Sequence, residues 1–341
     1  MNYLRKAIVT VLAAGALFTI SAASYAQVTL TFADHATLSH YLSTDGSVYF
    51  MERAKELSGG EIEWRHYPAQ QLAKADGILE AAQRGRIDAG LLISQYVSDQ
   101  LPLNGVGALP GMIENTTEGS QAYWSLVKKE SPLRKEFTDH GVEPLGVFLL
   151  PPYQIMSTKK PIQSVAELNG RKVRTAGGAQ NLTMRELGAV PVNVSAPDLY
   201  LALERGTVDG AVFSFLSGRG YRLEEVISSA TTNANLASLP MALIVNSEKF
   251  ESLPSNIQKA LVQAGEDTVR HIGEYMDKEE KKAAEEFEAA SVEVYQLSPD
   301  VREQIAGAFE PAKQDWVRRL EKRGLDAKAV LDSFEQALQG R

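Results

Sequence analysis

Residues 168–215 read LNGRKVRTAGGAQNLTMRELGAVPVNVSAPDLYLALERGTVDGAVFSF, and this stretch decides the fold class. A short basic strand at 171–174 is followed by Gly177-Gly178 and a helix near 179–187. An apolar strand at 190–194, a helix at 196–204 and a second apolar strand after Asp209-Gly210 complete the run. A β-α-β-α-β order of this kind is typical of a parallel sheet wound with helices.

Arg174 ends the first of these strands, directly before a helix. In wound α/β sheets, small ligands bind beyond the carboxyl ends of the strands, where helix N-termini point. We therefore expect Arg174 to bind the carboxylate of a small organic acid. The alternative is an ordinary surface ion pair at the end of a strand.

A second stretch repeats the last part of this unit. EAAQRGRIDAGLLI at 80–93 and LALERGTVDGAVFS at 201–214 both contain a helix that ends in Arg-Gly, then an Asp and an apolar strand. Glycine suits the end of a helix because it adopts the left-handed conformation. The copies lie about 120 residues apart, farther than solenoid repeats do. Two related α/β lobes with a cleft between them fit this spacing, although a common helix-to-strand turn would also produce it.

Length and charge narrow the class of protein. The 341 residues suit two domains rather than one core, and 44% apolar and 23% charged residues are typical of a globular chain. The formal charge is −8, and −10 once Arg5 and Lys6 are removed with the N-terminal segment (33 basic against 43 acidic residues). An acidic chain without a basic stripe argues against nucleic acid as a partner.

The first 26 residues have the pattern of a cleavable secretory signal. Arg5 and Lys6 precede an apolar run at 7–20, and Ser24-Tyr25-Ala26 is a small-x-small cleavage site. An uncleaved membrane anchor is the alternative, but the apolar run is short for a span. The chain has no cysteine, which excludes disulfides and a lipid-anchored N-terminal cysteine. We expect a free periplasmic protein.

Later segments suggest how two lobes would be joined. A strand at 142–149 leads into Pro151-Pro152, and another at 241–246 returns. Residues 255–290 are almost continuously helical and would span about 50 Å, so this helix should lie across both lobes. Helices at 299–323 and 326–338 close the chain. We assign 27–150 and about 240–275 to lobe I, and 151–239 and about 276–341 to lobe II.

No motif indicates catalysis or a metal site. The five histidines are scattered without HExxH spacing, and no GxSxG elbow or phosphate-binding loop occurs. We expect no cofactor and no metal. A hydrolase built on two carboxylates stays open as an alternative, because the sequence does not show which residues meet in space.

The order of these elements resembles one known family. LNGRKVRTAGG, ALERGTVDGAV and the opening strand followed by a long helix are similar to DctP-type solute-binding proteins of tripartite ATP-independent periplasmic (TRAP) transporters. The resemblance covers most of the chain after residue 26. It implies a two-lobed, type II-like periplasmic binding protein fold with crossing strands and a helix spanning both lobes. It also implies a carboxylate ligand on Arg174 and delivery to TRAP membrane permease subunits.

Two departures from that family suggest the kind of ligand. Where many members carry a second arginine, this chain has Tyr153 and Gln154, and where many carry an asparagine after the Asp-Gly turn it has Phe213. We therefore expect a monocarboxylate with an apolar or aromatic body. Phe213 and Phe215 can equally be core residues of a strand.

Loops after other strands supply the remaining candidates for ligand contact, which are His35, Tyr41, Ser94 and Tyr96. Each of these side chains can equally be an ordinary solvated loop residue. We expect a monomer that captures a small organic acid and delivers it to the permease. A periplasmic enzyme, or a binding subunit serving a sensor or an ATP-driven importer, is the alternative function.

Overall fold

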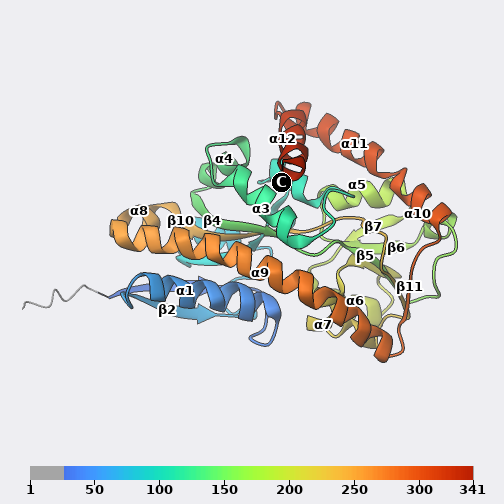
Figure 1. Ribbon diagram of the computed structural model, residues 1–341, viewed down its shortest axis with the longest axis horizontal. Coiled ribbons are helices and arrows are strands. Elements are labelled where there is room, and N and C mark those ends of the chain that lie inside the picture. Colours follow the sequence, from blue (N-terminus) through green and yellow to red (C-terminus); the bar gives the residue numbers. More distant parts are fainter. Residues whose placement is uncertain (1–26, 341) are drawn as a thin grey trace, which may run out of the picture.

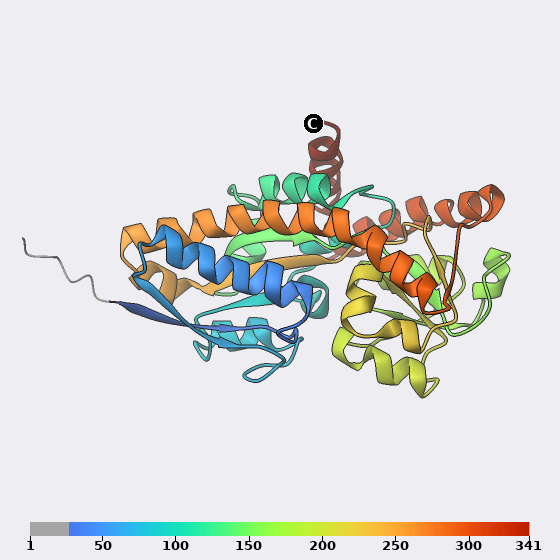
Figure 2. The same cartoon turned by 60° about the horizontal axis from the view of Figure 1, so that its bottom comes forward.

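The computed structural model describes residues 27–340, so the signal-peptide prediction for 1–26 lies outside the described part. Two sheets lie side by side, and one long helix, α9 (Ser255–Ala289), runs along both (Figures 1 and 2). This is the expected two-lobed α/β fold.

The first sheet has the strand order β2-β1-β3-β10-β4. β1, β2 and β3 are parallel, whereas β10 is antiparallel to both of its neighbours. The strands are β1 (Val28–Ala33), β2 (Ile62–Tyr67), β3 (Ala89–Ile93), β4 (Val142–Leu149) and β10 (Pro240–Asn246). The helices of this part are η1 (Leu42–Val48), α1 (Tyr49–Leu57), α2 (Ile78–Gln83), η2 (Ser94–Val97), η3 (Leu103–Ala108), α3 (Thr116–Val127), α4 (Pro132–Asp139) and α8 (Ser247–Ser252).

The second sheet has the order β11-β9-β5-β8-β6-β7. The predicted β-α-β-α-β run forms its parallel part, β7-β6-β8, and β5 joins it antiparallel. The strands are β5 (Gln154–Ser157), β6 (Lys172–Thr175), β7 (Val190–Asn193), β8 (Gly210–Phe213), β9 (Ser229–Thr231) and β11 (Glu293–Tyr295). The helices are η4 (Val165–Leu168), α5 (Ala179–Glu186), η5 (Ala196–Asp198), α6 (Leu199–Glu204), α7 (Phe215–Gly220) and η6 (Leu223–Glu225).

The repeated Arg-Gly-x-x-Asp turn has the same hydrogen bonds in both sheets. Asp88 Oδ2 accepts from the backbone N of Thr31 at 2.7 Å, and Asp209 Oδ2 accepts from the backbone N of Lys172 at 2.9 Å. Gly85 and Gly206 before them have φ of 64° and 66°, the left-handed conformation that ends a helix. Each aspartate therefore ties the strand that follows it to a neighbouring parallel strand.

Two extended segments cross between the sheets and are bonded to each other. The backbone N of Leu150 donates to Leu239 O at 3.0 Å, and that of Tyr153 donates to Ala237 O at 2.7 Å. Leu236 N donates back to Tyr153 O at 3.0 Å. These are the expected crossing segments, and with α9 they connect the two lobes.

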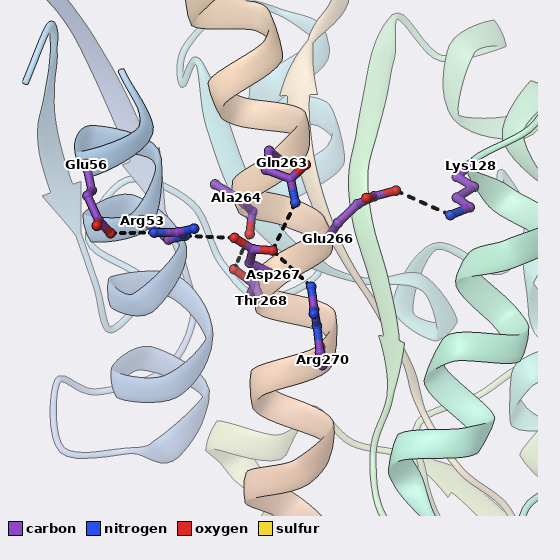
Figure 3. Close-up of polar contacts among 9 residues, drawn as sticks. All are labelled: Arg53, Glu56, Lys128, Gln263, Ala264, Glu266, Asp267, Thr268 and Arg270. Carbon is purple, nitrogen blue, oxygen red and sulfur yellow. Dashed lines mark hydrogen bonds and ion pairs between the residues drawn. The ribbon is translucent and has the colours of Figure 1, made fainter. Parts of the chain in front are cut away.

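Polar contacts hold α9 between α1 and α3 (Figure 3). Asp267 Oδ2 of α9 accepts a hydrogen bond from Arg53 Nε of α1 at 2.7 Å. Glu266 of α9 forms an ion pair of 3.4 Å with Lys128, which directly follows α3. Underneath, α9 crosses β4 so closely that a Cβ on Gly265 would overlap the carbonyl oxygen of Leu145. The glycine thus permits backbone-to-backbone packing of helix on sheet.

Three details of the chain differ from the sequence-based expectation. The helix expected at 299–323 is broken into α10 (Pro299–Ala306) and α11 (Phe309–Glu321). Pro311 explains the break, because its ring clashes with the carbonyl four residues earlier, at Gly307. Phe215 begins α7 rather than continuing a strand. Helix α12 (Ala327–Gln339) packs on α3 beside the first sheet, although we assigned 276–341 to lobe II.

Candidate ligand-binding site

Arg174 lies in β6 beside β8, and its side chain is 0% exposed. Its Nε donates to the carbonyl oxygen of Val194 at 2.8 Å, and its Cζ lies 5.0 Å from the centre of the Phe213 ring. A cation over an aromatic face is stabilised by the ring quadrupole. The carbonyl of Val194 and the ring of Phe213 therefore hold the guanidinium in place. Its two Nη atoms remain for other hydrogen bonds.

Tyr96 reaches the same guanidinium from the other lobe. Its hydroxyl accepts from Arg174 Nη2 at 3.1 Å and from the backbone N of Ala196 at 2.7 Å. Those two bonds use both lone pairs of the oxygen, so its own hydrogen remains to be donated. Burial raises the pKa of Tyr96 despite the opposing charge of Arg174, which keeps the hydroxyl protonated.

Aromatic rings from both lobes extend from Arg174 in an unbroken series. Phe213 lies 5.5 Å from Tyr153 and 6.2 Å from Tyr221, measured between ring centres. Tyr221 in turn lies 4.9 Å from His40, which stacks on Tyr41 at 4.8 Å. Tyr153 comes from a crossing segment, and His40 and Tyr41 come from the loop after β1. The wall beside the guanidinium is therefore aromatic.

Several buried polar atoms around this wall have no hydrogen-bond partner among residues 27–340, and we call them the open polar atoms. They include Arg174 Nη1, Tyr153 Oη, Tyr221 Oη, His35 Nδ1, Ser94 Oγ and both side-chain polar atoms of Gln95. A buried polar group without a partner costs about 1–3 kcal/mol. Arg174, Tyr153 and Tyr221 all lie against Phe213, so a polar ligand bound there could supply their missing hydrogen-bond partners.

Both histidines of the site are neutral near pH 7. Burial lowers the pKa of His35 to about 4, against the opposing charge of Asp34. Burial, His35 and Arg219 lower the pKa of His40 to about 3, against a backbone contact with Ser217. Arg174 therefore supplies the positive charge of this cluster.

Direct contacts join the two lobes around the cluster. Tyr41 Oη and Ser217 Oγ share a hydrogen bond of 2.9 Å. The His40 ring lies so close to Gly220 that a Cβ on this glycine would overlap the ring. In the same way, a Cβ on Gly178 would overlap the side chain of Gln95. The lobes are thus closed on each other at three points besides Tyr96.

The sequence candidates fall into two groups. The structure brings together Arg174, Tyr96, Tyr153 and Phe213, with Tyr41 beside Ser217, and it leaves His35 and Ser94 buried with open polar atoms. Gln154, the first residue of β5, lies elsewhere: its Oε1 accepts from Thr231 Oγ1 of β9 at 3.1 Å and from the backbone N of Ala234 at 2.9 Å.

Sequence reasoning missed Tyr221, His40 and Ser217. Tyr221 follows the short helix α7, and His40 lies on a loop where only Tyr41 and His35 were singled out. No local pattern marks these residues, because their position beside Phe213 comes from the meeting of two lobes. Only the Gly-Arg-Gly before Tyr221, which allows close approach, is visible in the sequence.

No group of three or more histidine or acidic side chains within 27–340 is placed to hold a metal ion. In the same range no helix combines the length and apolar character needed to cross a bilayer.

The model of the bacterial extracellular solute-binding proteins of family 7 (DctP) matches residues 33–319. The chain belongs to this family. The C4-dicarboxylate-binding periplasmic protein DctP of Rhodobacter capsulatus is 25% identical over 301 residues, 83% of this chain and 86% of that one. The chain is accordingly a TRAP solute-binding protein, a transport component rather than an enzyme.

Solved structures of TRAP solute-binding proteins have the same fold. A marine metagenome protein specific for aromatic acid ligands, in complex with metahydroxyphenylacetate, has a TM-score of 0.86 at 25% identity, covering 92% of this chain and 99% of that one. The same protein was also solved with 3-hydroxybenzoate. A protein from Rhodoferax ferrireducens T118, with copurified benzoate, has a TM-score of 0.86 at 22% identity, covering 92% and 98%.

Proposed function

We propose that this TRAP solute-binding protein captures a monocarboxylate with an aromatic body between its lobes and delivers it to its membrane permease. The observation that carries the proposal is the buried guanidinium of Arg174, which is held by Val194 O and Tyr96 with Nη1 still an open polar atom. A guanidinium presents parallel N–H donors that match a carboxylate.

The surroundings of Arg174 support one carboxylate rather than two. His35 and His40 are neutral, and the walls are the rings of Tyr153, Phe213 and Tyr221. A second carboxylate would be buried there without a matching cation, which is strongly unfavourable. An aromatic ring can instead pack edge-to-face or offset against these side chains.

Periplasmic location after cleavage behind Ala26, and action as a monomer, belong to the same proposal. Family members are periplasmic binding proteins that work with permease subunits, which supports this location. The pattern at 1–26 supports export, and the mature chain would begin at Gln27.

A thermal-shift panel tests the ligand class. The purified protein is heated with benzoate, phenylacetate, a branched aliphatic acid, succinate and the neutral amide benzamide. We expect an aromatic monocarboxylate to raise the melting temperature because it binds only the folded protein. Benzamide, which lacks the charge, should have no effect. Stabilisation by succinate but by neither aromatic acid would overturn the proposal.

A further inference from the structure

Phe213 is the centre of a group of polar side chains. The rings of Tyr153 and Tyr221 lie 5.5 and 6.2 Å from its ring, and the Arg174 guanidinium lies 5.0 Å from it. Both tyrosine hydroxyls are buried and are open polar atoms within residues 27–340. Three neighbours of one phenylalanine thus carry hydrogen-bonding capacity that the described chain does not use.

The two hydroxyls belong to rings that pack on the same phenylalanine, Phe213. Burial raises the pKa of Tyr153 and that of Tyr221, while the charge of Arg174 opposes the rise in each. Each of these groups also interacts electrostatically with Tyr96, and Tyr153 acts on Tyr221. Both hydroxyls are therefore protonated, and their rings pack on the same phenylalanine as the Arg174 guanidinium.

The chemistry of these groups differs from that of Arg174. Arg174 Nη1 and the hydrogen of Tyr96 can only donate in this arrangement, which suits a carboxylate because it only accepts. A tyrosine hydroxyl both donates and accepts. A ligand hydroxyl suits two such tyrosines, because it can donate a hydrogen bond to one of them and accept one from the other.

We propose, on the basis of the function proposed above, that Tyr153 and Tyr221 form a hydroxyl-recognition subsite, and that the preferred ligand is a hydroxylated aromatic monocarboxylate. An acid without the hydroxyl leaves two buried tyrosine groups without partners. The difference between the two kinds of acid is then about tenfold or more in affinity.

A further anionic group in this subsite would be less favourable. Arg219, whose charge acts on His40, is already paired with Glu286 at 3.1 Å and with Glu279 at 3.7 Å. A neutral hydroxyl needs no counter-charge. The inferred class is thus a hydroxy acid with one carboxylate rather than a dicarboxylate.

Isothermal titration with matched acids tests the inference. The pairs are benzoate with 3-hydroxybenzoate, phenylacetate with 3-hydroxyphenylacetate, and phenylacetate with mandelate. The proteins are wild type, Tyr153→Phe and Tyr221→Phe. Tyr200→Phe serves as the control, since Tyr200 bonds Glu225 on the surface of the same lobe.

We expect wild type and the control to prefer the hydroxylated member of at least one pair by about tenfold. Tyr153→Phe and Tyr221→Phe should each reduce that preference at least fivefold, with little change for the partner acid. Equal affinity within threefold for every pair, or a preference that survives in both variants, overturns the inference while the carboxylate function stands. If no aromatic acid binds wild type, the proposed function itself fails.

Discussion

At the scale of single residues, the hydrogen bond between Arg174 and Tyr96 joins the two lobes at the proposed ligand site. Nε of Arg174 is bonded to its own lobe, Nη2 is bonded to the opposite lobe, and Nη1 is an open polar atom. A carboxylate placed at the Nη1–Nη2 end of the guanidinium would also be within the reach of a donor hydroxyl on Tyr96. Binding and closure would then use the same contacts.

Tyr96→Phe tests this link. The change removes one oxygen, so the buried donors Arg174 Nη2 and Ala196 N lose their acceptor. We expect benzoate or its hydroxylated analogue to bind about tenfold to a hundredfold more weakly by calorimetry. Tyr67→Phe, at the end of β2, should bind as wild type does. Equal affinities for wild type and Tyr96→Phe would show that the hydroxyl plays no part in binding.

The lowered pKa of His35 makes the free energy of unfolding depend on pH, and it fixes the direction of that dependence. Its pKa is about 4 in the folded protein and about 6.5 in the unfolded chain. Between these values the unfolded chain binds more protons, so the free energy of unfolding decreases as the pH is lowered. For one such histidine the loss at pH 5.5 is about 1.4 kcal/mol. Glu136 and Glu280, whose pKa burial raises to about 7, act in the opposite direction between about pH 4.5 and 7.

The test therefore compares variants. The free energy of unfolding is measured with urea at pH 7.5 and at pH 5.5. Between these values it should decrease by about 1.4 kcal/mol less in His35→Asn than in wild type. His140→Asn, which changes a histidine bonded to Gln100 O at the end of α4, should follow wild type. Identical pH dependence in wild type and His35→Asn would mean that His35 is not buried as a neutral ring.

At the scale of elements, α9 is positioned by side chains on its flanks and by a glycine underneath. Arg53 and Lys128 pair with its two flanks (Figure 3). On the side that faces the sheet, Gly265 lets it approach β4. One turn apart, Asp277 and Glu280 bind the first residues of α3 and α7, one from each lobe. The helix is therefore attached to both lobes at the point where it passes between them.

Gly265→Ala tests the close packing of α9 on β4. The new Cβ would overlap Leu145 O, and neither backbone can yield cheaply because each belongs to a regular element. We expect a loss of about 2 kcal/mol in the free energy of unfolding, despite the better helix propensity of alanine. Gly77→Ala, where the added Cβ meets nothing closer than 3.5 Å, is the control. Unchanged urea midpoints for Gly265→Ala would contradict the packing described.

Elements with a local signal were predicted well from the sequence. The run at 168–215 and the duplicated turn gave the parallel part of the second sheet, and the 35-residue helix α9 has the expected bounds within a residue. Strand β9 was missed because three residues carry too little pattern to recognise. The break between α10 and α11 was missed although Pro311 lies in the sequence to signal it.

The candidate site was only partly predictable, for a physical reason. Arg174 and Phe213 stand at the ends of predicted strands, where ligands of α/β proteins bind. Tyr221 and His40 touch each other only because two lobes close, and no periodicity encodes that meeting. Gln154 follows Tyr153 in an extended segment, so its side chain points to the opposite face, where it bonds Thr231 and Ala234.

At the scale of the whole molecule, two crossing segments and α9 connect the two lobes (Figures 1 and 2). The lobes also meet where Tyr96 bonds Arg174. The contacts between the lobes include Tyr96 on Arg174, Tyr41 on Ser217, His40 on Gly220 and Gln95 on Gly178. A ligand that forms hydrogen bonds with the open polar atoms binds this closed form more tightly than an open form. That difference in binding free energy sets how strongly the ligand favours closure. The carboxylate on Arg174 is the central part of that difference.

The most direct measurement is calorimetric titration of Arg174→Ala with the aromatic acid that binds wild type best, beside Arg171→Ala. Arg171 lies three residues earlier and pairs with Glu167 at 3.6 Å, so the control removes the same charge from the same segment. With folding checked by circular dichroism, we expect Arg174→Ala to lose at least about a hundredfold in affinity and Arg171→Ala to match wild type. Micromolar binding retained by folded Arg174→Ala would contradict the account.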